Sequence, residues 1–345
     1  MTQAEQATAA QLVDDTGAIA FGIYPDTVAQ VNGRDYDYRT PMGKPAGPLR
    51  KHFQYKQFQY FGIVSDHLLA GCAFADTAYL GLAFAYVFDT RTGTLHESTW
   101  RSPLARDLHM SASPVDGQSL FEKGTVRIAL GYGDNGQGRN KSLTLSAGGL
   151  EINARLQEPP HYQPMSLCTR IGVNGWAYAN KVAGVPVTGN VTYAGQTHDL
   201  GAIGAWGHHD FSAGYMRRET FWNWACLSGM AGGHQLGMNL SCGVNETSFT
   251  ENCLWLDGKL IKVAGTTFDY DRDDLMAPWR VRSTDGKVDL TFVPAGRHRE
   301  TLNLAVFASN FHQIFGTFQG TLHVDGRDIA VDRIHGFVEE QYAKW

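Results

Sequence analysis

Charged residues are scarce in this sequence: they make up 18% of its 345 residues, and lysine and arginine form no dense tract. The formal net charge is −5, so the protein lacks the basic surface that a general nucleic-acid-binding protein needs. No apolar run reaches the roughly 18 residues of a membrane span, and the N-terminus lacks the basic and apolar segments of a secretory signal. We expect a cytoplasmic protein with no nucleic-acid partner and no integral membrane segment; its oligomeric state is not indicated.

Sequence signatures of metal, nucleotide and nucleophile sites are also missing. The histidines show neither HxH nor HExxH spacing, and GxSxG is absent. Residues 131–138 (GYGDNGQG) depart from GxGxxG spacing, so we interpret them as a long turn. The five cysteines have no CxxC spacing and stand in apolar runs, which favours buried thiols: Cys72, Cys168, Cys226, Cys242 and Cys253. We expect neither a metal ion nor another cofactor.

Glycine, with 39 residues, and aromatic side chains, at 12% of the chain, are abundant. Short β-branched or aromatic runs are cut by glycine-containing turns about every ten residues, which is typical of β-strands. Alternation in the run KVDLTFVP, for example, puts Val288, Leu290 and Phe292 on one face. Asp-Gly pairs predict hairpin turns at residues 257–258, 285–286 and 325–326. The sequence therefore predicts an all-β protein.

The chain contains an approximate internal repeat. Residues 189–195 and 320–326 share glycines at the same separation, with alternating apolar residues between them. An aromatic cluster opens each copy, and each copy ends with an isoleucine, an aromatic residue and a polar cluster. We interpret this as a duplication that gives two antiparallel β-barrel halves. The expected division is an extended lead-in over residues 1–53 and barrel-like domains over 54–214 and 215–345.

The densest polar cluster consists of His208, His209 and Asp210, between aromatic residues. Histidine titrates near neutral pH, and desolvation beside aromatic rings raises the pKa of a carboxyl group, so the cluster is able to hold and deliver a proton. Because adjacent strand residues point to opposite faces, either His208 and Asp210 or His209 alone can face one cavity. An outward or structurally satisfied His-Asp turn is the alternative. Glu340, in the second copy, is the other candidate acid.

Aromatic residues concentrate where each half opens. They exceed what hairpin pairing requires, and either fill a barrel core or line a cavity for an apolar ligand, since barrels of about eight strands have room for one. The candidates for such a lining include Tyr60, Trp206, Tyr215, Trp222 and Trp224. Lys181 and Glu251 are weaker polar candidates for the same site.

Several segments, which together span nearly the whole chain, resemble a bacterial family of domains of unknown function: residues 56–63 (KQFQYFGI), 175–181 (GWAYANK), 210–215 (DxxxGY), 222–225 (WNWA), 250–252 (TEN), 278–280 (PWR) and 336–345 (GFVEEQYAKW). More distantly, AWGHHD at 205–210 and WNW at 222–224 are similar to the A-W-x-D-H-x-W-G and W-D-W signatures of carotenoid 1,2-hydratase and its lipocalin-like relatives.

The distant resemblance implies two calycin/lipocalin-like β-barrels, apolar ligands such as polyenes and, in some members, water addition or cyclisation without a cofactor. Aligning His209 with the hydratase histidine puts His208 where the motif has aspartate, and Asp210 is the alternative retained acid.

We predict a cofactor-independent enzyme that hydrates, dehydrates or isomerises a hydrophobic isoprenoid- or lipid-like alkene or alcohol. Asp210 would protonate this substrate, assisted by His209 or His208. A developing carbocation would be stabilised by the rings of Tyr215, Trp222 and Trp224. The alternative is a non-catalytic protein that binds or carries a lipid or pigment, which needs the same aromatic lining but no titratable group in the cavity.

Overall fold

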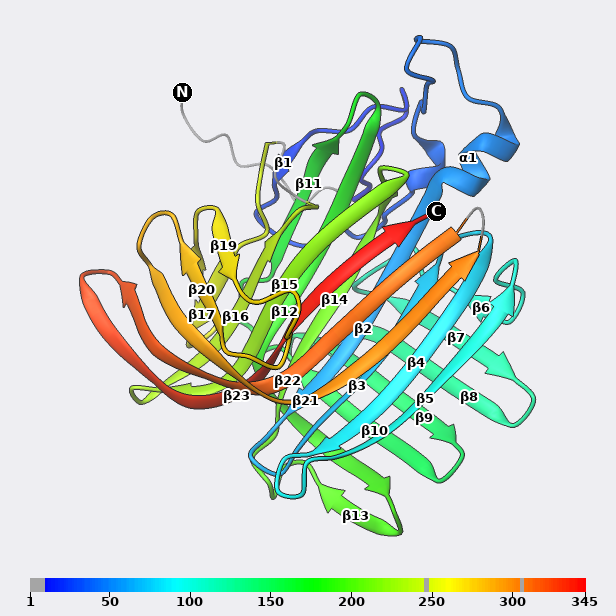
Figure 1. The fold of residues 1–345 in the computed structure, drawn as a ribbon. Coiled ribbons are helices and arrows are strands. Elements are labelled where there is room, and N and C mark those ends of the chain that lie inside the picture. Colours follow the sequence, from blue (N-terminus) through cyan, green and yellow to red (C-terminus); the bar gives the residue numbers. More distant parts are fainter. Residues whose placement is uncertain (1–9, 245–247, 305–306) are drawn as a thin grey trace.

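The structure is a computed structural model that describes residues 10–244, 248–304 and 307–345. Within these residues the chain is almost entirely β, with one short α-helix and one turn of 3-10 helix. The strands form two antiparallel sheets, the first built from β1–β14 and the second from β15–β23 (Figure 1). The prediction of an all-β protein is confirmed.

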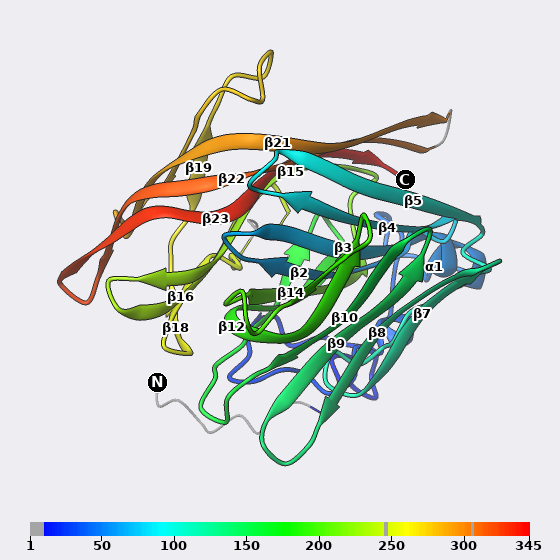
Figure 2. The same cartoon turned by 90° about the horizontal axis from the view of Figure 1, so that it is seen from below.

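The first sheet curves into a nearly closed barrel (Figure 2). Its main order is β5-β4-β3-β2-β14-β12-β10-β9-β8-β7-β6, with β11 and β13 beside β12, and β1 beside β11. The strands are β1 (Gly22–Ile23), β2 (Tyr55–Val64), β3 (Leu68–Asp76), β4 (Leu80–Asp89), β5 (Thr94–Pro103), β6 (Leu108–His109), β7 (Gly117–Lys123), β8 (Val126–Asp134), β9 (Arg139–Ala147), β10 (Leu150–Gln157), β11 (Met165–Ile171), β12 (Gly175–Tyr193), β13 (Gln196–Asp199) and β14 (Trp206–Tyr215).

The second sheet has nine strands in the order β18-β17-β16-β15-β23-β22-β21-β20-β19. These strands are β15 (Glu219–Ala231), β16 (His234–Cys242), β17 (Cys253–Leu256), β18 (Lys259–Lys262), β19 (Thr266–Asp269), β20 (Trp279–Ser283), β21 (Val288–Leu304), β22 (Phe307–Val324) and β23 (Arg327–Lys344). Val288, Leu290 and Phe292 all lie in its core, as their alternation predicts. The Asp-Gly pairs form turns between β17 and β18, β20 and β21, and β22 and β23, also as predicted.

Both sheets share one pattern of strand pairing. In each, the first long strand pairs with the last strand, β2 with β14 and β15 with β23, and the other strands follow outward on either side. Gly189 and Gly320 have positive φ angles of 112° and 141°. A Cβ atom at these positions would lie 2.0 Å from the backbone oxygen of Asn153 and 2.4 Å from that of Asp289. Matched topology and matched glycines confirm the predicted duplication.

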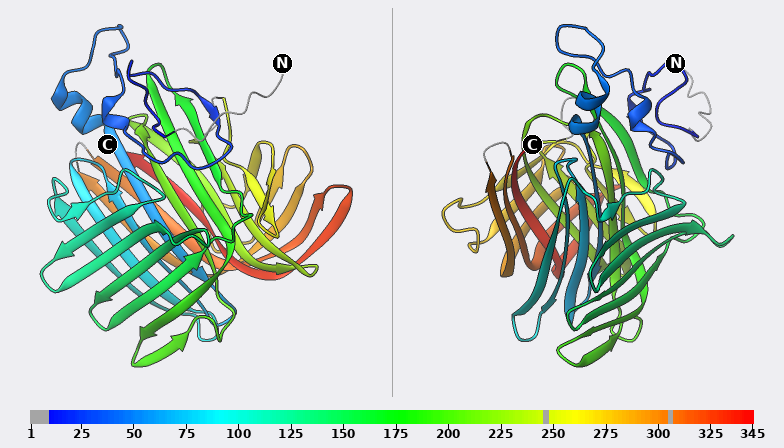
Figure 3. Two further views of the ribbon diagram at one scale, coloured as in Figure 1. Left: turned by 180° about the vertical axis from the view of Figure 1, so that it is seen from behind. Right: turned by 90° about the vertical axis from the view of Figure 1, so that its right-hand side faces the viewer.

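The N-terminal segment does more than lead into the first sheet. Its Val28 and Val31 are buried in the first core, and it contains η1 (Gly33–Asp35) and α1 (Pro48–Gln54), which the extended interpretation of residues 1–53 did not foresee. Helix α1 begins with proline, which suits the first helical position because its missing N–H has no partner there. It lies near the C-terminus (Figures 1 and 3).

The chain passes from the first sheet to the second between Tyr215 and Glu219. Our division into residues 1–53, 54–214 and 215–345 remains a proposal for the domain organisation. No helix in the described ranges has both the length and the apolar character needed to cross a membrane.

The two sheets come into direct backbone contact where β12 crosses β16. A Cβ atom at Gly184 would lie 2.6 Å from the backbone nitrogen of Gly237, and one at Gly237 would lie 2.5 Å from the carbonyl carbon of Ala183. Only glycine allows this approach. Elsewhere β5 and β21 are joined by an ion pair of Arg101 with Glu300 and by a hydrogen bond between Glu97 and His298. Facing surfaces of the two sheets enclose the site described next.

Candidate active site

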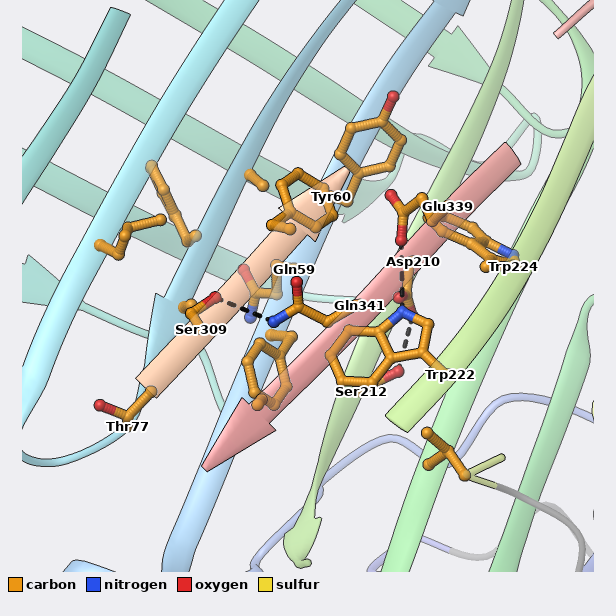
Figure 4. Close-up of a pocket in the computed structure, with 18 of the residues that line it drawn as sticks. Gln59, Tyr60, Thr77, Asp210, Ser212, Trp222, Trp224, Ser309, Glu339 and Gln341 are labelled. Atoms are coloured by element: carbon orange, nitrogen blue, oxygen red, sulfur yellow. Dashed lines mark hydrogen bonds between the residues drawn. The ribbon is translucent and has the colours of Figure 1, made fainter. Parts of the chain in front are cut away.

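A cavity of ≈ 190 Å³ lies between the two sheets and is lined by both halves of the chain. Much of the lining is apolar and includes Phe58, Leu80, Leu82, Phe84, Leu302, Phe307, Phe311 and Trp345. Polar side chains come from β2, β12, β14, β22 and β23 (Figure 4). The volume is below the roughly 300–1,000 Å³ of typical ligand pockets, which favours a small ligand or the reacting end of a longer one.

A buried ammonium group binds two carboxylates in this cavity. The Nζ atom of Lys181 lies 2.8 Å from Oδ2 of Asp210 and 3.4 Å from Oε1 of Glu251. The register of β12 and β14 places Lys181 directly opposite Asp210, and the Ser212 hydroxyl donates to Oδ1 of Asp210 over 2.7 Å. Burial raises the pKa of Asp210, while the Lys181 ammonium opposes that rise. Asp210 is thus held as a hydrogen-bonded ion pair inside the cavity.

Glu339 is a further acid of the cavity, which was not singled out from the sequence. The indole Nε1 of Trp222 donates to Oε2 over 3.3 Å, and Nε2 of Gln313 donates to Oε1 over 2.9 Å. Burial raises the pKa of Glu339 to about 8, against the opposing effects of the Trp222 hydrogen bond and the Lys181 charge. At neutral pH the Glu339 carboxyl therefore retains its proton in a mostly apolar space.

Lys181 contacts two carboxyl groups in the cavity, those of Asp210 and Glu251, and the protonated Glu339 lies in the same lining. Carboxyl groups that are fixed in a mostly apolar cavity are placed to stabilise positive charge that develops on a bound molecule. The arrangement combines a proton donor, a proton acceptor and an environment suited to a cationic transition state.

Strand alternation corrects the prediction for Glu340. Glu339 lines the cavity, whereas Glu340 lies on the other face of β23, where the Tyr270 hydroxyl donates to its Oε2. The sequence does indicate the correct residue. Phe337, Glu339 and Gln341 alternate along one strand and so lie on the same face, and Phe337 is the aromatic residue of the internal repeat. The repeat pointed to the right polar cluster but to the wrong residue in it.

Alternation also separates the two histidines, as expected, and neither lines the cavity. His208 is on the Asp210 face, but its ring packs on Gly62, Tyr60 and Phe337, and burial lowers its pKa to about 3. His209 lies on the opposite face, where its Nε2 is 3.2 Å from the Tyr132 hydroxyl. Burial, the first cause, lowers its pKa well below the usual value. Both correct the expectation of a histidine assisting Asp210.

The predicted aromatic lining divides into two groups. Tyr60, Trp222 and Trp224 line the cavity, as do Lys181 and Glu251. Tyr215 does not, because it is buried at the N-terminal segment, where it stacks on Tyr38 with ring centroids 4.2 Å apart. Trp206, at the start of β14, is half-buried and also lies outside the lining.

Trp222 and Trp224 contact polar and charged groups of the protein itself. The ammonium of Lys181 lies over the Trp224 ring, 4.7 Å from the ring centroid, and forms a cation–π contact with it. Trp224 also donates from Nε1 to Oδ1 of Asn239 over 2.8 Å. Trp222 donates to Glu339. Both rings thus contact ionisable side chains of the cavity, and their role in stabilising a substrate cation stays a prediction.

Comparison with known proteins gives a family and a shared fold. A family model described as "Domain of unknown function (DUF2804)" matches residues 3–345. No curated protein matches the sequence at a significant level. The fold resembles that of CghA with Sch210972 (TM-score 0.56, 12% identity, 98% of this chain and 97% of that chain). It also resembles kievitone hydratase from Nectria haematococca (TM-score 0.51, 10% identity, 94% and 98%). At these identities the likeness concerns the fold alone.

Proposed function

This chain belongs to the DUF2804 family, and we propose that it is an enzyme that hydrates, dehydrates or isomerises a small apolar alkene or alcohol by acid–base catalysis without a cofactor. The observation that carries this proposal is buried Glu339, whose pKa of about 8 keeps a proton available inside an apolar cavity at neutral pH. Asp210, paired with Lys181, supplies a neighbouring carboxylate. One protein of this fold is named a hydratase, which agrees with the proposal.

In hydration, Glu339 donates its carboxyl proton to one carbon of a double bond, and the π electrons form the new C–H bond. Water adds to the other carbon while Asp210 accepts one of its protons. The cycle closes when that proton returns from Asp210 to Glu339 through solvent. Dehydration is hydration run backwards. Isomerisation uses no water: Glu339 protonates one end of the double bond, and Asp210 removes a proton from the carbon next to the other end.

The surrounding residues orient the two acids and stabilise the charges that form during the reaction. Trp222 and Gln313 hold the two oxygens of Glu339 by hydrogen bonds, so the acid is oriented before the substrate binds. Lys181 and Ser212 hold Asp210 in the same way. The Asp210 and Glu251 carboxyl groups, fixed beside Lys181, offset positive charge that forms on the substrate carbon.

The test compares neighbouring residues of β23. Purified protein is incubated with apolar cell extract in ¹⁸O-enriched water and in D₂O, and products are followed by mass spectrometry. The wild type and the matched control Glu340→Gln should change one compound by the mass of water or exchange one of its hydrogens for deuterium. Glu339→Gln should slow that change by about 10²- to 10⁴-fold, the usual contribution of a positioned acid. Asp210→Asn should slow it as well.

Equal rates for Glu339→Gln and the wild type would remove the proposed mechanism. If the wild type changes no compound but retains one through purification, the protein is a carrier. The mostly apolar lining of the cavity is the observation that favours this second function. A carrier tolerates Glu339→Gln without loss of ligand, because its affinity comes from apolar contact.

A further inference from the structure

The amide of Gln341 is an unexplained polar group in the cavity. Gln341 lies on β23, on the same face as Glu339, and is 5% exposed. Its Nε2 donates to the Ser309 hydroxyl over 3.0 Å and to the backbone oxygen of Tyr342 over 3.1 Å. Its Oε1 is buried and has no hydrogen-bond partner in the described part of the chain. Figure 4 shows the amide nitrogen turned to Ser309 and the oxygen turned away from it.

The orientation of this amide follows from its partners. The carbonyl oxygen of Tyr342 only accepts hydrogen bonds, so the atom that faces it must be the NH₂ group of Gln341. Oε1 therefore points away from Tyr342. The Ser309 hydroxyl accepts from Gln341, which leaves its own hydrogen available for donation. An acceptor without a partner and an available donor thus belong to two side chains that are hydrogen-bonded to each other.

This polar pair stands among apolar side chains. Phe58, Phe311, Leu302 and Trp345 line the same cavity, and a buried carbonyl oxygen without a donor is unfavourable and rare in folded proteins. The protein supplies no donor for Oε1 among its described residues. A donor from a molecule in the cavity resolves this, and an alcohol or phenol is the simplest group that both donates to Gln341 and accepts from Ser309.

We propose that Gln341 and Ser309 form a hydroxyl-binding subsite, so that the molecule bound in the cavity is a hydroxylated apolar compound and not a bare hydrocarbon. Gln341 follows Glu339 by two residues on one strand face, a separation of roughly 6.5 Å along a β-strand. If Glu339 acts as proposed above, the bound hydroxyl lies at about that distance from the reacting carbon. Only this second statement rests on the proposed function; the subsite itself is a matter of binding.

The experiment measures binding of two probes that differ in one group, 2-naphthol and 2-methylnaphthalene, by calorimetric titration at pH 7. The wild type should bind 2-naphthol about tenfold more tightly, since the analogue leaves Oε1 of Gln341 unpaired. Gln341→Met should bring the two affinities to within about twofold, and Ser309→Ala should reduce the preference in part. Unchanged affinity for 2-methylnaphthalene in both variants shows that the cavity has kept its shape.

Two controls locate the hydroxyl. Gln319→Met, the same substitution at an exposed position of β22, should leave the tenfold preference intact. Glu339→Gln should also leave it intact, because the hydroxyl binds at the other polar group. A preference that survives Gln341→Met, that disappears instead in Glu339→Gln, or that is absent from the wild type contradicts the subsite. Since no turnover is measured, a failure of the catalytic proposal and a failure of the subsite give different results.

Discussion

Two of the buried lysines of the first sheet, Lys141 and Lys181, have surroundings that differ in their ion pairs and in space. Lys141 lies on β9 inside the first barrel and pairs with Glu158, which also binds Arg139. Arg139 in turn pairs with Asp26 of the N-terminal segment. Lys181 lies on β12 and faces Asp210 and Glu251 in the cavity between the sheets.

The barrel cluster balances two cations with two anions, and its Lys141 and Glu158 are almost completely buried. In the cavity cluster one lysine contacts two carboxyl groups, and the protonated Glu339 lines the same cavity. The barrel cluster joins the N-terminal segment to the barrel through ion pairs alone. A cluster with a protonated acid beside a cavity is suited to moving a proton. Buried ion pairs alone therefore do not mark a catalytic site; the surplus acid and the cavity do.

The largest expected effect concerns the surplus acid. Burial raises the folded-state pKa of Glu339 from its ordinary value of 4.5 to about 8. Between these values the unfolded chain releases the proton that the folded chain retains, so the unfolding free energy falls as pH rises, by about 5 kcal/mol in total. Glu339→Gln is always neutral and should abolish this fall. Urea unfolding of both proteins between pH 4.5 and 8 measures the difference.

Glu340→Gln is the matched control, since Glu340 lies on the opposite face of β23 and bonds to Tyr270. This variant should keep the wild-type pH dependence. If the unfolding free energies of Glu339→Gln and the wild type change with pH in the same way, Glu339 is ionised in the folded protein. That result would contradict the difference proposed between the two clusters.

The second effect concerns the balanced cluster. Lys141→Met leaves Glu158 buried without its lysine and should reduce the unfolding free energy by about 3–5 kcal/mol, the usual cost of removing one partner of a buried pair. Lys259→Met, at an exposed position of β18, should change it by less than about 0.5 kcal/mol. Chemical unfolding at pH 7 measures both variants. A loss no larger than that of Lys259→Met would show that the barrel cluster does not fasten the structure.

The smallest effect concerns Lys181, because its carboxylate partners line a cavity that admits water. Lys181→Met should cost about 2 kcal/mol at pH 8, where Asp210 and Glu251 lose their shared cation. The pKa of Asp210, already raised by burial, rises further, so the folded variant takes up protons as pH falls and the deficit shrinks toward pH 5. Unfolding at both pH values tests this; a deficit independent of pH contradicts it.

Much of the fold was predictable because its signals are local. Alternation placed Val288, Leu290 and Phe292 on one face, and the Asp-Gly pairs ended the expected strands. Matched glycines at 189 and 320 revealed the duplication. The same local signals predicted neither α1 nor the close contact of Gly184 with Gly237. The position of a glycine in the sequence does not tell which distant strand will pack against that glycine.

The candidate site was predictable in part. Asp210, Lys181 and Glu251 were each singled out, but the ion pairs among them depend on strand register and on the packing of the two sheets. Glu339 was missed by one position, because a shift of one residue reverses every side chain on a strand and the repeat did not fix that phase. His209 and Tyr215 looked equally suitable in sequence, yet they point into other parts of the first half.

Sequence by itself determined the all-β class, the duplication, the scarcity of charge and the polar clusters that hold the acids of the site. These properties follow from composition and from the period of two along a strand, which are properties of neighbouring residues. Tertiary structure decided which acid is buried and protonated, which lysine contacts two carboxyl groups in a cavity, and where space remains for a ligand. Those outcomes depend on desolvation and on distances between residues far apart in the chain, and only the packing of one sheet against the other sets them.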